Sequence, residues 1–248
     1  MRPSTQVLEV WGDLACFTRP ELKVERFSYP VITPSAARGI FDAVFWKRPK
    51  FRWQVTQVEV LNFPSYIALR RNEVKQGVKE RWPSVGAIEQ WRQGTADPQP
   101  LWADGEDDTG RTQRQTMALR GVRYRLHAKV RPWPEFAADL PALEAQFRRR
   151  AASGKCVYQP YLGCREFPAY FRLVEEPDPT PPPARVDMDL GLMLYDVFDL
   201  SRPGGADDRP AISLFRASVK SGVMAIPEYE EECVLKAVKE ECGCSISY

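Results

Sequence analysis

Strict alternation over residues 122–131 is the feature that most constrains how this 248-residue chain can fold. The even positions are apolar, and the odd positions are basic or titratable: Arg123, Arg125, His127, Lys129 and Arg131. Because successive side chains of a strand point to opposite faces, the pattern predicts a strand with one buried and one cationic face. Five such side chains, spaced about 6–7 Å apart, would form a track for phosphate groups. The alternative is an ordinary solvated face, although such faces usually carry both signs of charge.

The distribution of charge favours a polyanionic partner. The whole chain has 35 basic and 33 acidic residues, a net charge of +2. Residues 1–174 carry 28 basic and 18 acidic residues, whereas residues 175–248 carry 7 and 15. Arginine, which matches phosphate geometry and stacks on bases, supplies 25 of the 35 cations. We therefore infer a nucleic-acid partner, with a codon bias toward arginine as the alternative explanation.

The cysteines and the single histidine exclude several kinds of site. No two cysteines have the two-residue spacing of a zinc ribbon or a redox motif, and Cys242 and Cys244 lie in an expected exposed tail. His127 is the only histidine, which excludes two-histidine acid–base pairs and metal clusters built on several histidines. We expect no metal and no cofactor, although a magnesium site made only of carboxylates stays open. His127 is the first candidate for proton transfer.

The hydropathy pattern argues against a membrane protein. The mean hydropathy is -0.42, and no run approaches the 18 or so apolar residues that a membrane-spanning helix needs. The first ten residues hold no apolar signal segment. We therefore expect a cytoplasmic protein with no membrane partner.

The N-terminal part has the pattern of an α+β domain. Residues 7–11 are a predicted strand, and Thr33 before Pro34 is an N-cap followed by a favoured first helical residue. Apolar side chains then recur at helical spacing, at Ala37, Ile40, Phe41, Val44 and Phe45. Residues 51–61 alternate as a second strand. A strand, a helix and a strand with basic loops between them predict an α+β fold of ferredoxin-like (RRM-like) type.

The chain is expected to divide into two domains. A ferredoxin-like domain covers residues 1–174 and contains an insertion at about 62–115, which lacks a clean period. The insertion is expected to be partly helical near residues 88–92 and to hold a mobile loop around residues 94–112. A proline-rich linker over 175–185 leads to a small β-rich domain with an acidic tail, residues 186–248. The further expected elements are a helix over 136–150, strands over 156–161, 169–174, 190–198, 212–219 and 223–226, a hairpin turn at Lys220–Gly222 and a terminal helix over 228–241.

Seven segments, in order, carry a distinctive pattern: Trp11–Glu21, Lys23–Arg26, Pro34–Ile40, Phe45–Lys47, Arg70–Glu73, Gln113–Tyr124 and Leu162–Phe167. Together they closely resemble the Cas-five family of CRISPR-associated proteins, in its type I-C (Dvulg) subtype. The resemblance covers most of residues 7–220, so it is much more specific than any single motif.

The resemblance implies a fold and an activity. Members of this family have an N-terminal ferredoxin-like domain of the RAMP superfamily and a smaller β-rich C-terminal domain. They cut precursor CRISPR RNA within each repeat, beside the stem-loop, without a metal. They then stay on the 5′ handle of the mature crRNA as a subunit of the type I-C Cascade surveillance complex. The resemblance therefore implies repeat RNA, crRNA and other Cascade subunits as partners.

The catalytic set that the resemblance implies departs from the family pattern at two positions. The family uses a tyrosine at the end of the first helix, together with a lysine and a histidine on a central strand. Here Phe45 occupies the tyrosine position, and His127 precedes Lys129, the reverse of the family order. Because residues i and i+2 share a face, the pair is preserved. We expect proton transfer by His127 and stabilisation of the phosphorane charge by Lys129, with Tyr29 as a candidate substitute for the phenol.

The expected RNA contacts are basic side chains and one aromatic ring that can stack on a base: Arg19, Lys23, Arg26, Arg38, Trp46, Lys47, Arg70, Arg123, Arg125 and Arg131. The same residues suit a second hypothesis, a non-catalytic subunit that only caps the 5′ handle, which also accounts for the absent phenol. Binding of duplex DNA is a third, although the sequence contains no recognition helix or zinc finger.

Overall fold

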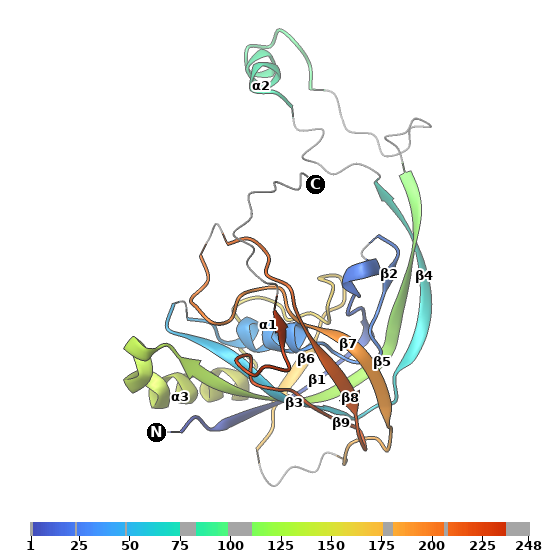
Figure 1. Ribbon diagram of the computed structural model, residues 1–248. Coiled ribbons are helices and arrows are strands. Elements are labelled where there is room, and N and C mark those ends of the chain that lie inside the picture. Colours follow the sequence, from blue (N-terminus) through green and yellow to red (C-terminus); the bar gives the residue numbers. More distant parts are fainter. Residues whose placement is uncertain are drawn as a thin grey trace. The chain divides into compact units, whose positions relative to one another are not determined.

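The computed structural model of the protein describes residues 2–22, 24–47, 49–74, 83–98, 111–175, 181–205 and 208–236. The fold is α+β with antiparallel sheets, and Figure 1 shows the order of its elements. The chain forms two compact units, one of residues 1–67 and 117–248 and the other of residues 68–116. No helix of the described residues is long and apolar enough to cross a membrane.

The first unit is built on a sheet whose strands run in the order β6-β1-β5-β3-β9, with β2 also paired to β5. The strands that pair around β5 are antiparallel to it. All five expected strands of this sheet are confirmed, two of them longer than predicted. Their bounds, with that of β2, are β1 (Thr5–Ala15), β2 (Arg26–Phe27), β3 (Phe51–Val60), β5 (Arg111–Pro132), β6 (Tyr170–Leu173) and β9 (Val223–Ala225).

Helix α1 (Pro34–Val44) begins where its N-cap predicts. The side chain of Thr33 accepts a hydrogen bond from the Ala36 N–H at 3.3 Å, which satisfies one of the free amides of the first turn. The apolar positions of the helix are buried, among them Ile40 and Phe41. Such an amphipathic face gains most of its stability from packing, so the partner of this face decides where the helix lies.

One aromatic cluster holds both helices against the same face of the sheet. The ring of Trp53 on β3 lies 4.9 Å from Phe41 of α1 and 4.7 Å from Phe147 of α3 (Leu140–Ala152), between centroids. The Trp53 Nε1–H donates to the Phe45 carbonyl at 3.0 Å, so the buried indole is satisfied. The helix expected over 136–150 is divided into a 3₁₀ helix, η3 (Pro134–Asp139), and α3. A shorter 3₁₀ helix, η1, covers Pro20–Leu22.

Strand β5 confirms the alternation from which the sequence argument began. Its apolar positions from 122 to 130 are all buried, and Leu126, Ala128 and Val130 have no exposed surface. These side chains face α1 and α3. The opposite side of the sheet, which carries Arg123, Arg125, His127 and Lys129, is called the charged face below.

A second sheet has the order β10-β8-β7. Its strands are β7 (Met188–Asp196), β8 (Ser213–Val219) and β10 (Leu235–Lys236), and the first two confirm the predictions. The expected hairpin turn follows β8, with Ser221 at φ 49° and Gly222 at φ 79°, the left-handed conformation that such a two-residue turn requires. Because β9 then pairs with β3, the C-terminal part contributes strands to both sheets.

The unit of residues 68–116 contains helix α2 (Val85–Arg92), as expected, and most of a strand that the sequence analysis missed. That strand, β4 (Ser65–Val74), pairs with β5. None of residues 65–73 is buried, so no apolar period marks the strand in the sequence. The loop expected over 94–112 lies largely outside the described residues.

Two predicted elements are wrong. Residues 156–161 form bends and a single bridge from Tyr161 to Pro168. The Val157 N–H donates to the Ala43 carbonyl of α1 at 2.6 Å rather than to a neighbouring strand. Residues 228–236, expected to begin a helix, form turns and β10 instead. Two carboxylates of this segment form ion pairs with arginines of the larger sheet: Glu228 binds Arg131 of β5, and Glu230 binds Arg52 of β3. Residues 237–248, with Cys242 and Cys244, lie outside the described part.

Candidate functional site

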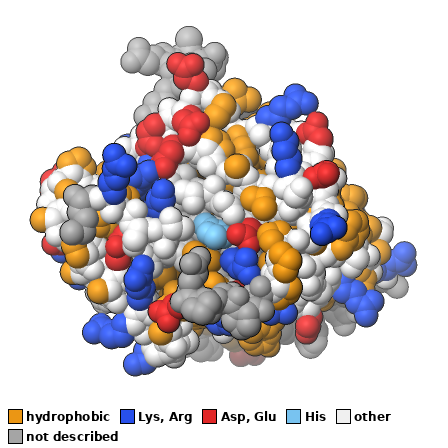
Figure 2. Space-filling model, turned by 90° about the horizontal axis from the view of Figure 1, so that it is seen from below, with side chains coloured by type: hydrophobic (Ala, Val, Ile, Leu, Met, Phe, Trp, Pro, Cys, Tyr) orange, Lys and Arg blue, Asp and Glu red, His pale blue; other side chains and the backbone are white. Residues whose placement is uncertain are grey.

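His127 lies in the middle of the charged face, on the central strand of the larger sheet. Its Nε2 is 2.8 Å from Oε1 of Glu59, and its side chain is 18% exposed. The register of β3 and β5 produces this contact, because Gln57 pairs with His127 and Glu59 with Arg125. Figure 2 shows the histidine at the surface with acidic and basic side chains beside it.

Glu59 is the organising residue of this site, and the sequence analysis missed it. One carboxylate oxygen meets His127, and the other accepts a hydrogen bond from Nη1 of Arg125. Gln57 adds a third contact, donating from Nε2 to Oε1 of Glu59 at 3.0 Å. Glu59 alternates with buried Val58 and Val60, which marks it as facing away from the core. Only the strand register places it beside the histidine.

The surroundings keep the ring of His127 neutral near pH 7. Burial lowers its pKa, the nearby Glu59 carboxylate opposes this, and the Arg125 charge lowers it further, so the pKa lies below the ordinary value. In a neutral ring beside a carboxylate, Nε2 carries the proton and donates it to Glu59. Nδ1 then holds a lone pair, and within the described residues no hydrogen bond involves it. A neutral imidazole with one free nitrogen is suited to act as a general base.

Carboxylates from neighbouring strands neutralise much of the charged face. Arg123 and Arg172 both bind Glu9, Arg125 binds Glu59, and Arg131 binds Glu228. The charged face as a whole therefore carries both signs of charge, although the polar side chains that β5 contributes over 122–131 are all basic or titratable. The alternation of one strand does not reveal what its neighbours present, and these carboxylates come from β1, β3 and the C-terminal segment. Lys129, by contrast, has no ion-pair partner among the described residues, and it follows His127 on the same face.

Phe45 is separated from His127 by the sheet. Its side chain is 3% exposed and stacks on Phe51 with ring centroids 5.4 Å apart, among the residues that pack against α1 and α3. Tyr29 does not replace the missing phenol. It is buried, and its hydroxyl accepts the Leu194 N–H of β7 at 3.3 Å. The structure brings His127 and Lys129 to one face and leaves Phe45 on the other.

Besides the three on β5, three more of the arginines expected to bind RNA have partners within the chain. The Arg38 guanidinium donates to Asp196 at 2.7 Å and to Asp42 at 2.6 Å, so it joins α1 to β7. The other two have weaker partners: Arg26 pairs with Glu166 at 3.2 Å, and the Arg19 guanidinium lies 4.7 Å from the ring centroid of Tyr29. Trp46, Lys47 and Arg70 are exposed, and Lys23 lies outside the described residues.

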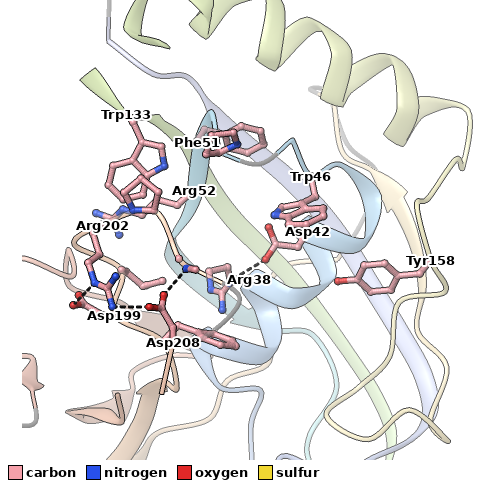
Figure 3. Close-up of a pocket in the computed structure, with 16 residues that line it drawn as sticks. Arg38, Asp42, Trp46, Phe51, Arg52, Trp133, Tyr158, Asp199, Arg202 and Asp208 are labelled. Carbon is pink, nitrogen blue, oxygen red and sulfur yellow. Dashed lines mark hydrogen bonds and ion pairs between the residues drawn. The ribbon is translucent and has the colours of Figure 1, made fainter. Parts of the chain in front are cut away.

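A pocket of about 360 Å³ lies beside the end of α1. Figure 3 shows the aromatic rings of Trp46, Trp133 and Tyr158 around it, and Arg38 with Asp42 at its edge. Trp46 is 49% exposed, so its ring can accept a stacking partner. Burial raises the pKa of Asp42 to about 6, although the Arg38 charge acts against the shift. His127 and Lys129 do not line this pocket.

No group of three or more His, Cys, Asp or Glu side chains able to hold a metal ion occurs among the described residues. The carboxylates of the charged face are each bound to arginine or histidine rather than to one another. The imidazole of His127 is able to transfer a proton, and the ammonium of Lys129 is able to stabilise negative charge.

The chain is similar to known proteins over most of its length. Residues 5–227 match the family model described as CRISPR-associated protein (Cas_Cas5). The chain is 39% identical to a protein of Mannheimia succiniciproducens, over 91% of this chain and 96% of that one, and 38% identical to a protein of Thermus thermophilus, over 90% and 93%. Both relatives carry the name CRISPR pre-crRNA endoribonuclease Cas5d.

Solved structures share the fold at lower identity. A crystal structure of a CRISPR-associated protein matches 94% of this chain and 98% of that chain, with a TM-score of 0.60 and 22% identity. The protein SMU1763c of Streptococcus mutans, described as functionally uncharacterized, matches with the same coverage, a TM-score of 0.59 and 19% identity. With the family model matching most of its length, the chain belongs to the Cas5 family of CRISPR-associated proteins.

Proposed function

We propose that this chain is an endoribonuclease that cleaves precursor CRISPR RNA within the repeat, beside the stem-loop. It then stays on the 5′ handle of the crRNA as a subunit of a type I-C Cascade complex in the prokaryotic cytoplasm. The identity of 38–39% to two proteins named pre-crRNA endoribonucleases is the observation that carries the proposal. The neutral, hydrogen-bonded His127 on a cation-bearing sheet face supplies the chemistry.

The proposed reaction is attack of a ribose 2′-oxygen on the adjacent phosphate, leaving a 2′,3′-cyclic phosphate and a 5′-hydroxyl. Nδ1 of His127 accepts the 2′-hydroxyl proton, while Glu59 holds the ring through Nε2. The ammonium of Lys129 stabilises the charge that develops on the phosphorane, since no carboxylate of the described residues neutralises it. Arg123, Arg125 and Arg131 are more constrained, because each already binds a carboxylate.

The finer description of the fold is also a proposal. The order β6-β1-β5-β3 and the chain order β1, α1, β3, β5, α3, β6 support a ferredoxin-like core. Two helices on one face of a four-stranded antiparallel sheet are the arrangement that this βαββαβ type requires. The division into domains of residues 1–174 and 186–248 stays a prediction.

RNA contacts outside the charged face are proposed for basic and aromatic side chains. Trp46, beside its pocket, is placed to stack on a base, and Lys47 follows it at the surface. Arg19, Lys23, Arg26 and Arg70 are proposed as phosphate contacts. Arg38 is the member of the expected set whose buried ion pairs favour a structural role.

The activity is tested with repeat RNA in excess chelator. We expect the RNA to be cut at one position, and the same RNA with a 2′-deoxyribose at that nucleotide to stay intact, because the attacking oxygen is gone. Gel analysis of end-labelled RNA, with detection of the cyclic phosphate, measures both results. Cleavage that requires added magnesium, or that proceeds on the deoxy substrate, would contradict the mechanism. A chain that binds the RNA without cutting it would instead be the non-catalytic cap that the core position of Phe45 favours.

The rate of cleavage is expected to depend on pH through His127. Because burial lowers the pKa of this ring below 6.5, the neutral base is already formed near pH 7. The single-turnover rate should therefore rise with pH at acidic pH and reach a plateau below neutrality. A rate that keeps rising above pH 8 would indicate a base of higher pKa. Glu59→Gln serves as the comparison: removing the carboxylate lowers the pKa of His127 further, so the rising limb should move to lower pH.

A further inference from the structure

Two aromatic rings are exposed side by side on the charged face. Trp11 of β1 and Tyr170 of β6 are direct partners in the sheet register. Their side chains are 36% and 54% exposed, and their rings stack with centroids 6.2 Å apart and planes 26° apart. Exposed aromatic rings on a sheet surface offer stacking partners to the π-faces of unpaired bases.

Two guanidinium groups adjoin this aromatic pair. Arg123 and Arg172 are 42% and 39% exposed, and both bind the carboxylate of Glu9, whose side chain has no exposed surface. A hollow of about 450 Å³ lies here, lined by Trp11 and Asp13 as well as by the two arginines and Glu9. One buried carboxylate thus fixes two half-exposed guanidinium groups beside the rings, so little side-chain entropy is lost when a phosphate binds them.

The sheet register places this cluster next to the proposed catalytic histidine. Trp11 pairs with Arg123, and Val7 of the same strand pairs with His127. Four residues along a strand span about 13 Å. Side chains at odd positions of β1 point to the charged face, so the rings, the two arginines and His127 all lie on one surface. A short single strand of RNA can contact both places at once.

We propose that Trp11 and Tyr170 form a stacking platform for unpaired bases of the repeat RNA beside the cut, with Arg123 and Arg172 bound to the phosphate between them. This rests on the proposed function, since the RNA is its substrate. A duplex does not fit the platform, because base faces inside a duplex are covered by their neighbours. The platform orients the single strand so that the 2′-hydroxyl reaches His127.

The platform is tested by fluorescence anisotropy with repeat RNA that carries a 2′-deoxyribose at the cut nucleotide, so that binding is measured without cleavage. Trp11→Ala and Tyr170→Ala should each raise Kd about tenfold, as loss of one base–ring stack predicts. Trp11→Phe and Tyr170→Phe keep a ring and should stay within about threefold of wild type. An isolated stem-loop without the single-stranded flank should bind all variants equally.

A second arm replaces the unpaired bases beside the cut with abasic sites, one at a time. At least one abasic site should weaken binding to the wild-type protein about tenfold and have no further effect on Trp11→Ala or Tyr170→Ala. Equal Kd values for wild type and both Ala variants, or wild-type binding unaffected by every abasic site, would overturn the platform. The effect of abasic sites on binding by the wild-type protein can be measured even where an Ala variant fails to fold. Cleavage of unmodified RNA by the wild type, measured in parallel, tests the proposed function separately from the platform.

Discussion

The replacement His127→Ala is expected to lower the rate of repeat-RNA cleavage by about 10²–10⁴-fold, the usual contribution of a general base. His127 is the only histidine of the chain, so no other imidazole can take over the proton. Its side chain is part of no apolar core, and the charged groups around it, Glu59 and Arg125, still have each other. Binding of the RNA should therefore change by less than about threefold.

Single-turnover cleavage at saturating protein measures the chemical step, and anisotropy with the deoxy substrate measures binding. Arg149→Ala is a suitable control, because Arg149 is exposed on α3, which covers the opposite face of the sheet. Lys129→Ala should also reduce the rate with little change in binding, whereas Lys129→Arg should restore part of it by returning a cation. A His127→Ala protein that cuts RNA at the wild-type rate would remove the histidine from the mechanism.

The replacement Arg38→Met is expected to lower the free energy of unfolding by about 3–5 kcal/mol, the usual cost of leaving a buried charge without its partner. Asp196, whose side chain is 2% exposed, would lose both guanidinium contacts, although it keeps the backbone N–H groups of Val197 and Phe198 at 2.8 and 3.0 Å. Asp42 would lose its partner as well, at 17% exposure. Urea unfolding at pH 7 measures the change.

A second replacement and a change of pH separate this structural role from RNA contact. Adding Asp42→Asn to Arg38→Met removes one of the two unpaired carboxylates and should recover part of the loss. The deficit should also narrow as the pH falls from 7 toward 6, because the Asp42 pKa, already raised to about 6 by burial, rises further without the arginine, so this carboxyl becomes neutral at a higher pH in the variant than in the wild type. Arg149→Ala should change the free energy of unfolding by less than about 0.5 kcal/mol. Unchanged stability with weakened RNA binding would make Arg38 the RNA contact that its charge suggested.

Local signals predicted the elements with strong periodicity. The alternation of residues 122–131 identified the central strand and its two faces, and Thr33 with the apolar spacing behind it identified α1. The residues after Val219 form the expected hairpin because the turn needs only local conformational freedom. Strand β4 could not be predicted in this way. None of its residues 65–73 is buried, so the hydropathy pattern does not indicate that this segment pairs in a sheet. The strand predicted over 156–161 is wrong because the Val157 N–H donates to the Ala43 carbonyl of α1 rather than to a neighbouring strand.

Only part of the candidate site could be predicted from the sequence. His127 and Lys129 could be proposed from one strand, since side chains two positions apart share a face in any sheet. Glu59 could not, because it comes from β3, and a shift of one residue in register would turn it to the core. The cluster of Glu9, Trp11 and Tyr170 could not be predicted from the sequence either, because these residues come together only where β6, β1 and β5 lie side by side.

The sequence by itself determined which face of the central strand is apolar and which is polar, because that depends only on the alternation of neighbouring side chains. The tertiary structure decided what each polar side chain meets. It turned an apparent row of cations into ion pairs for Arg123, Arg125 and Arg131, and it left Lys129 without a carboxylate among the described residues. The physical reason is that ion pairs across a sheet depend on strand order and register, which are fixed by packing between segments far apart in the chain.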